Sequence, residues 1–201
     1  LIENYDYISK LCKEIDFKVC DNYSVKEYKI GEICGIEKGK SPIKKTQPGE
    51  YPLVVTAEER LSSVDYQLDR EAVCIPLVSS TGHGHASMKR IHYQKGKFAL
   101  GNILCALYST NEEILLTKYL YIYLSYHKDD LLVKLMKGTT NVSLSMKDIL
   151  SATINVPSID VQLEVIERIE KVNMISKKIA EVREQEQEFE RAYYSLLLDK
   201  L

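Results

Sequence analysis

The sequence lacks the features that mark several common classes of protein. Its five cysteines, in 201 residues, are odd in number and form no C-x-x-C pair, so neither a disulfide framework nor a zinc site is indicated. No apolar run reaches the roughly 18 residues of a transmembrane helix, and no segment resembles a signal peptide. We therefore expect a protein of the reducing cytoplasm that makes no membrane contact.

Motifs of DNA-processing enzymes are missing as well. An adenine methyltransferase needs a Pro-Pro-Tyr or Pro-Pro-Phe segment, and the chain has no Pro-Pro pair. The Glu27-Tyr28-Lys29 sequence has no Pro-Asp before it, so a nuclease site is not indicated, and no Ser, His and Asp residues match an acyl-transfer motif. Residues 35–41 resemble a P-loop with one residue missing, but Pro42 excludes the helix that must follow. We expect a non-catalytic protein without cofactor or metal.

Positive charge is concentrated locally, although the net charge of the chain is only −2. No Asp or Glu occurs over residues 72–111 or over residues 131–147. The basic residues of these segments, besides three His in the first, are Lys89, Arg90, Lys95, Lys97, Lys134, Lys137 and Lys147. A local potential can be positive while the whole chain is nearly neutral.

Residues 28–157 predict a compact α+β domain. Segments rich in Val, Ile, Leu and Tyr and bounded by Gly, Pro or Ser predict strands at residues 28–37, 51–56, 72–80, 97–109 and 152–156. From residue 112 the apolar spacing predicts one helix, and a second short helix at residues 131–135. We expect a mixed or antiparallel sheet, or a barrel-like one, with short helices. A separate amphipathic helix is expected at residues 1–15.

A lysine-rich loop is predicted at residues 38–47, which we call the lysine loop. Its basic residues are Lys38, Lys40, Lys44 and Lys45. Ser41 and Pro42 interrupt the segment, which favours an exposed turn. The loop either is simply solvated or contacts the phosphates of a nucleic acid.

A second loop, residues 79–90, follows an apolar segment and contains two glycines, which allow the backbone to approach a ligand closely. Its candidate nucleic-acid contacts are Ser80, Thr81, His83, His85, Lys89 and Arg90, since hydroxyls and imidazoles donate to phosphates or base edges. His83 and His85 have no third ligand at a metal-site spacing, so no metal is expected. A glycine-rich hairpin with incidental histidines is the alternative.

The third loop, residues 137–145, lies in the second acid-free segment. Its candidate DNA contacts are Lys137, Thr139, Thr140, Asn141 and Ser143. Short side chains of this kind reach phosphates and base edges, and Asn can form two hydrogen bonds with adenine. A structural role is equally open, because Ser145 precedes a predicted helical turn and can cap it.

No Gly or Pro follows Pro157, and a single stripe of apolar residues at steps of three and four predicts one long helix. The stripe contains Ile169, Val172, Ile175, Ile179, Val182, Phe189, Tyr193 and Leu196. A helix of about 40 residues is about 60 Å long. A narrow stripe flanked by Glu, Lys and Arg is typical of a coiled coil. The alternative is a solitary surface helix.

The order of these motifs resembles the specificity subunit of Type I restriction-modification systems. The segments that carry the resemblance are YKIGEI from Tyr28, YPLVV from Tyr51, SSTGHG from Ser79, GTTNVSLS from Gly138 and INVPSIDVQLEVIERI from Ile154, followed by the long helix. The resemblance covers residues 28–201. Gln162 matches a Gln near the start of the helix in that family, whereas Pro157 stands alone where members commonly have two prolines.

The resemblance implies a target recognition domain at residues 28–157 and a dimerisation and spacer helix at residues 158–201, with a helical segment or linker at residues 1–27. Family members usually hold two such domains, each reading half of a split DNA site, and two helices paired in a coiled coil. The implied partners are double-stranded DNA and the modification (methyltransferase) and restriction subunits. This sequence holds one half, so we expect a half-length subunit that forms a homodimer, or part of a longer chain whose helices pair internally.

Two other functions stay open at this point. The chain can be the C-terminal recognition domain of a fused adenine methyltransferase or restriction enzyme, which sequence upstream of Leu1 would decide. It can also be a coiled-coil adaptor that binds protein and not DNA. Salt-dependent binding to duplex DNA distinguishes a recognition domain from such an adaptor.

Overall fold

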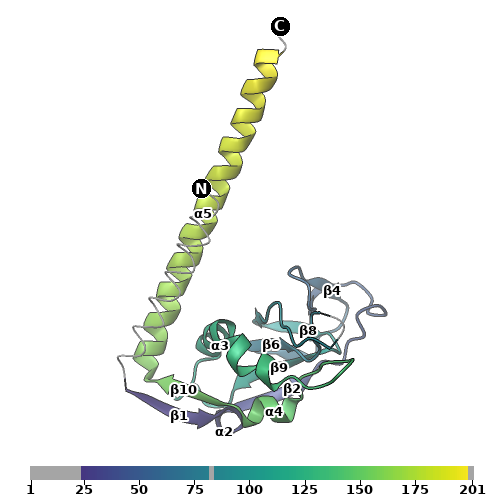
Figure 1. Ribbon diagram of the computed structural model, residues 1–201, viewed down its shortest axis with the longest axis vertical. Coiled ribbons are helices and arrows are strands. Elements are labelled where there is room, and N and C mark those ends of the chain that lie inside the picture. Colours follow the sequence, from purple (N-terminus) through teal and green to yellow (C-terminus); the bar gives the residue numbers. More distant parts are fainter. Residues whose placement is uncertain (1–23, 82–83, 199–201) are drawn as a thin grey trace. The chain divides into compact units, whose positions relative to one another are not determined.

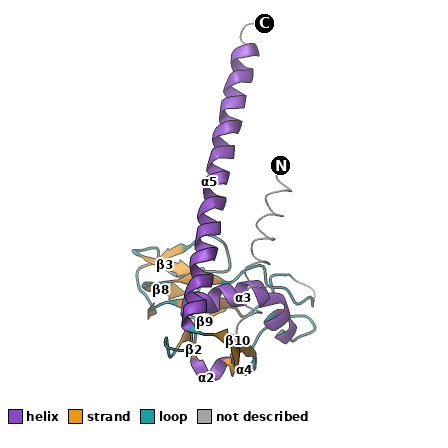
Figure 2. Ribbon diagram, turned by 90° about the vertical axis from the view of Figure 1, so that its left-hand side faces the viewer, coloured by secondary structure: helices purple, strands orange, loops and turns teal. Residues whose placement is uncertain are grey.

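The computed structural model describes residues 24–81 and 84–198. It divides into two compact units, Tyr23–Leu163 and a second that includes Glu164–Leu201. Figures 1 and 2 show strands and short helices in the first unit and one long helix, α5 (Ile159–Leu198), which begins in the first unit and continues through the second. The helix expected at residues 1–15 lies outside the described residues.

The first unit contains a four-stranded antiparallel sheet in the order β2-β9-β6-β7. Its strands are β2 (Cys34–Lys38), β9 (Leu104–Ser109), β6 (Ala72–Pro76) and β7 (His92–Gln94). β6 is buried along its whole length, which explains why it reads as a continuous apolar run. Cys34, Cys74 and Cys105 lie in these strands, and burial raises the pKa of each thiol to about 12, so the thiols stay protonated and unreactive.

A second four-stranded sheet has the order β4-β3-β8-β5. β3 (Tyr51–Val54) and β8 (Lys97–Leu100) pair in parallel, and β4 (Leu61–Ser63) and β5 (Leu68–Asp69) form the antiparallel edges. The single strand expected at residues 97–109 is wrong, because the chain crosses from β8 in this sheet to β9 in the other. Val54 and Phe98 belong to one buried cluster with Cys74 and Leu104, so the two sheets share a core.

The strand expected at residues 28–37 is interrupted by a helical turn, α2 (Ile30–Ile33), between β1 (Val25–Lys29) and β2. Ile30 and Ile33 are both buried. In a continuous strand, residues three positions apart would point to opposite faces, whereas a helical turn places both on the same side. The backbone amide of Lys29 donates to Glu32 Oε2 at 3.0 Å and closes the start of the turn.

The remaining elements of this unit follow β9 in the sequence. α3 (Thr117–Leu131) is followed by a 3-10 turn, η1 (Val133–Leu135), and α4 (Met146–Ser151) precedes β10 (Thr153–Pro157), which pairs antiparallel with β1. The short helix expected at residues 131–135 is found as η1, which is a 3-10 turn and begins two residues later, because α3 continues through Asp129 and Asp130 to Leu131. Lys128 forms an ion pair of 2.8 Å with Asp129, and Lys134 forms one of 2.5 Å with Asp130.

The expected long C-terminal helix is confirmed by α5, which has 40 residues. Most of the expected apolar stripe is exposed to solvent, and Phe189 is the most exposed member at 74%. The side chain of Leu196 lies outside the described part of the chain.

Among the helices that the structure describes, none combines the length and the apolar character needed to cross a membrane. The mixed α+β class expected from the sequence is confirmed, with a two-stranded sheet and two four-stranded sheets among the described residues.

Candidate nucleic-acid interface

The lysine loop and the loop at residues 79–90 leave the first sheet at the same end. β9 lies between β2 and β6 (Figure 1) and pairs antiparallel with both. Lys38, the last residue of β2, pairs with Cys105, and Pro76, the last residue of β6, pairs with Leu104. The two strands therefore end on either side of the start of β9, and both loops begin there.

The third loop is hydrogen-bonded to the second. The backbone amide of Ser79 donates to Val142 O at 3.0 Å, and the amide of Leu144 donates to Leu77 O at 2.9 Å. Gly84, with φ of +80°, lies so close to Thr139 that an added Cβ would collide with its carbonyl oxygen. Both the positive φ and this collision therefore require glycine at position 84. The structure thus brings together the two acid-free segments, which are far apart in the sequence.

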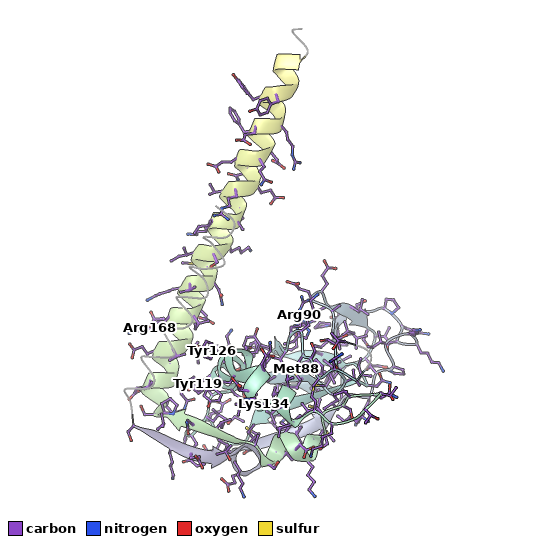
Figure 3. All side chains as sticks on the ribbon, viewed as in Figure 1. Met88, Arg90, Tyr119, Tyr126, Lys134 and Arg168 are labelled. Carbon is purple, nitrogen blue, oxygen red and sulfur yellow. The ribbon has the colours of Figure 1, made fainter. Side chains whose placement is uncertain are left out.

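The loop at residues 79–90 is held in shape by its own hydroxyl groups. Ser79 Oγ donates to His85 O at 2.6 Å and accepts from the amide of Ser87 at 3.1 Å. Ser80 Oγ lies 2.8 Å from Ser87 Oγ. Met88, labelled in Figure 3, is buried, whereas Ser80 and His85 are exposed. His83 lies outside the described residues.

The candidate cations differ in their exposure to solvent and in whether they form ion pairs. Lys38, Lys40, Lys44, Lys45 and Lys89 are exposed. Arg90 forms an ion pair of 2.9 Å with Glu58, and Lys137 forms one of 3.1 Å with Asp148. Both pairs are partly exposed, and such pairs contribute about 0–1 kcal/mol. A phosphate can therefore compete for either cation.

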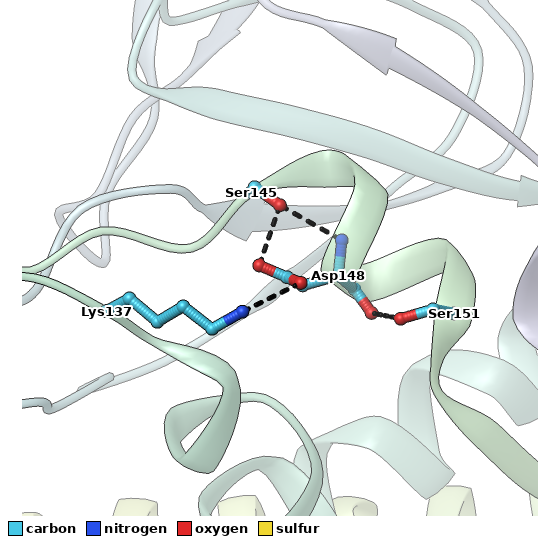
Figure 4. A network of polar contacts seen from close by, with 4 residues as sticks. All are labelled: Lys137, Ser145, Asp148 and Ser151. Carbon is cyan, nitrogen blue, oxygen red and sulfur yellow. Dashed lines mark hydrogen bonds and ion pairs between the residues drawn. The ribbon is translucent and has the colours of Figure 1, made fainter.

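The capping role considered for Ser145 is confirmed. Its Oγ accepts a hydrogen bond of 3.0 Å from the backbone amide of Asp148 at the start of α4. The same hydroxyl donates to the Asp148 carboxylate at 2.8 Å, and Lys137 reaches the other carboxylate oxygen (Figure 4). Hydrogen bonds from Ser145 and Lys137 lower the pKa of Asp148. The network fixes one end of the third loop and leaves Thr139, Thr140, Asn141 and Ser143 exposed.

Arg60 is a structural cation that the sequence did not single out. Its guanidinium group lies 3.1 Å from His92 Nδ1 and donates to Gln94 Oε1 at 3.1 Å. Burial, with Arg60 and Arg90 nearby, lowers the pKa of His92 to about 4. This histidine of the acid-free segment is therefore neutral at pH 7 and adds no positive charge to the surface.

Gln67 is a second residue that sequence reasoning missed. Its Nε2 donates to Lys38 O at 2.8 Å, and its Oε1 accepts from the backbone amide of Lys40 at 2.9 Å. The side chain therefore fixes the start of the lysine loop. No local signal could have revealed this contact, because 27 residues separate Gln67 from Lys40.

The family of the chain follows from comparison with known proteins. Residues 22–186 match the family model of the Type I restriction modification DNA specificity domain. The chain belongs to this family. The resemblance of its sequence motifs to Type I specificity subunits is thereby confirmed. No curated protein sequence matches the chain.

Solved structures have the fold of this specificity domain at low sequence identity. The S subunit of a Type I restriction-modification system from M. genitalium is 15% identical with a TM-score of 0.53, and the match covers 81% of this chain and 40% of that one. The HsdS subunit from Thermoanaerobacter tengcongensis is 15% identical with a TM-score of 0.59, covering 90% and 48%. A structure on complex assembly and conformational transition of the type I R-M system is 18% identical with a TM-score of 0.61, covering 95% and 53%. This chain thus spans about half the length of the chains in these structures.

Proposed function

We propose that this specificity domain recognises one half of a split site in double-stranded DNA and directs modification and restriction subunits to it. Family membership implies DNA target recognition. The observation that carries the proposed contact surface is the meeting of three loops: two begin at one end of a sheet, and the third is hydrogen-bonded to the second. Together they hold all fifteen candidate DNA contacts named from the sequence.

The roles of these residues follow from their chemistry. The exposed lysines at positions 38, 40, 44, 45 and 89 contact phosphates and supply most of the affinity. Thr139, Thr140, Asn141 and Ser143 carry short side chains suited to base edges. Methylation and cleavage belong to the partner subunits, in the cytoplasm, and this chain contributes no catalytic group and no cofactor.

We also propose that α5 pairs with another helix of the same kind. Ile175, Val182 and Phe189 are 52%, 54% and 74% exposed along one stripe. A long helix with such a stripe gains stability when a second helix covers it. The partner is the α5 of a second copy, or a matching helix in a longer chain.

The test measures binding of the chain to mixed-sequence duplex DNA at about 50 and about 200 mM salt. A protein that neutralises five phosphates loses affinity with a slope of about −4.5 in log K against log salt. We expect a slope near this value. Absence of binding above background at the lower salt would support the coiled-coil adaptor and overturn the proposal. A methyltransferase segment encoded upstream of Leu1 would instead make the chain the recognition end of a fused enzyme.

A further inference from the structure

A polar cavity of about 600 Å³ opens between the lysine loop and the β4–β5 loop, residues 64–67. We call it the loop pocket. Its wall includes Lys40, Lys45, Asp65, Tyr66 and Gln67. Its volume is typical of ligand sites, about 300–1,000 Å³, but its lining is polar and not the largely apolar lining of small-molecule pockets. It therefore suits a polar group presented by a larger partner.

The two loops that form the loop pocket are tied together at both of its ends. Gln67 bonds the backbone at Lys38 and Lys40, with distances of 2.8 and 2.9 Å. At the other end, the backbone amide of Val64 donates to Gln47 O at 3.1 Å. A site fixed in this way loses little conformational entropy when a ligand binds.

Tyr66 forms an aromatic wall of the pocket. Its ring centroid lies 5.0 Å from that of Tyr51, and Lys97 Nζ lies 4.9 Å from the centroid. The side chain is nevertheless 44% exposed. Two neighbours thus hold the ring in position while part of it remains available for contact.

Asp65 is the one acid among the residues that line the pocket. Its exposed carboxylate shares the pocket with Lys40 and Lys45, where it weakens attraction for phosphate. An ionised carboxylate only accepts hydrogen bonds. In the major groove of DNA, the donors that bases present are the amino groups of cytosine N4 and adenine N6, and guanine offers only acceptors there.

We propose that the loop pocket reads an exocyclic amino group of cytosine or adenine, with Asp65 as its acceptor and Lys40 and Lys45 on the neighbouring phosphates. This inference rests on the proposed function and adds a specificity-determining residue to it. Guanine and thymine on the contacted strand are disfavoured because their major-groove oxygens then face the carboxylate, while the amino group of the paired base lies toward the other strand. Asp65 therefore lowers the affinity of the protein for DNA of any sequence. In exchange, it lets the protein discriminate between bases at one position.

The test is selection of bound duplexes from a pool of random-sequence double-stranded DNA, followed by sequencing. The full chain is compared with its Asp65→Ala and Glu59→Ala variants. Glu59 is the matched control, because it is an exposed acid in the β3–β4 loop that does not line the pocket. Thermal unfolding followed by circular dichroism establishes that each variant is folded. Asp65→Asn, which has the same shape, replaces Asp65→Ala if the latter unfolds.

We expect the wild type and Glu59→Ala to select the same motif, with one position restricted to a single base pair, either C·G or A·T. Asp65→Ala should lose about tenfold to a hundredfold of discrimination at that position alone. The base enriched by the wild type distinguishes cytosine from adenine. A motif unchanged in Asp65→Ala would overturn the inference and leave the proposed function standing. No enrichment by the wild type would overturn both.

Discussion

Gln162 Oε1 accepts a hydrogen bond of 2.9 Å from the backbone amide of Leu116, which lies 46 residues earlier in the chain. Its Nε2 donates to the carbonyl oxygens of Ile114 and Pro157 at 2.8 and 2.9 Å. The side chain is fully buried, with 0% exposure. These bonds fix the first turn of α5 to the segment that precedes α3.

Replacing Gln162 should destabilise the unit Tyr23–Leu163. In Gln162→Ala, the buried carbonyl oxygen of Pro157 and the part-buried amide of Leu116 and carbonyl oxygen of Ile114 lose their partner, and an unsatisfied buried group costs about 1–3 kcal/mol. We expect the free energy of unfolding in urea to fall by about 2–4 kcal/mol. Gln185→Ala, in an exposed part of α5, should change it by less than about 0.5 kcal/mol. Equal effects of the two substitutions would show that the Gln162 bonds are not needed.

Removing lysines of the loop surface should weaken DNA binding for all sequences alike. In Lys44→Gln/Lys45→Gln/Lys89→Gln, three phosphate contacts are lost, so the salt slope should become shallower by about 2.7. The control Lys171→Gln/Lys177→Gln/Lys178→Gln removes the same charge from α5 and should leave the slope unchanged. Binding is measured by fluorescence anisotropy over a range of salt concentrations. If both triple variants have the same salt slope, the three loops do not form the surface that contacts DNA.

The ion pair between Glu58 and Arg90 should restrain DNA binding. Glu58 holds the Arg90 guanidinium at 2.9 Å (Figure 3 shows Arg90 at the surface). In Glu58→Gln, Arg90 is free to contact a phosphate, so we expect affinity at low salt to rise severalfold and the salt slope to steepen by up to about 0.9. The neighbouring Glu59→Gln removes the same charge without freeing Arg90 and should leave the slope unchanged. If the two variants have the same slope, Arg90 takes no part in phosphate contact.

Charges placed in the apolar stripe of α5 should separate paired helices. Phe189→Glu/Tyr193→Glu puts two carboxylates where the stripe is 74% and 53% exposed in the single chain. Burying a carboxylate in a helix interface is strongly unfavourable, so sedimentation should show a shift from dimer to monomer. Arg191→Glu, off the stripe, is the control and should keep the wild-type mass. A wild type that is monomeric at every concentration tested would contradict pairing with a second copy.

Local patterns were reliable where local physics decides the structure. The unbroken run after Pro157 predicted α5, because a helix needs only helix-forming residues and an apolar stripe. Ser145 was correctly considered as a cap, since capping involves residues three positions apart. The apolar run of β6 predicted its strand, although the strand ends at Pro76 and not at residue 80. The short strands β4, β5 and β7 were missed because each has only two or three residues.

The sequence did not reveal which charges neutralise one another. Lys89 and Arg90 are neighbours in the chain and looked equivalent, but only Arg90 lies against Glu58, in the loop after β3. Lys137 likewise pairs with Asp148, eleven residues away, across the third loop. These contacts depend on where separate loops meet. The sequence therefore indicated which cations were candidates for DNA contact, but not which of them already form an ion pair with an acid.

By itself, the sequence determined the α+β class, the long terminal helix and the three loops with few acids, because helical periodicity, apolar runs and charge are properties of neighbouring residues. Only the tertiary structure decided that two of the loops begin at one end of a sheet and the third is bonded to the second, that Gln162 anchors the helix, and that Asp65 shares a pocket with Lys40 and Lys45. Strand order and register set those relationships, and they join residues that are separated by tens of positions in the chain.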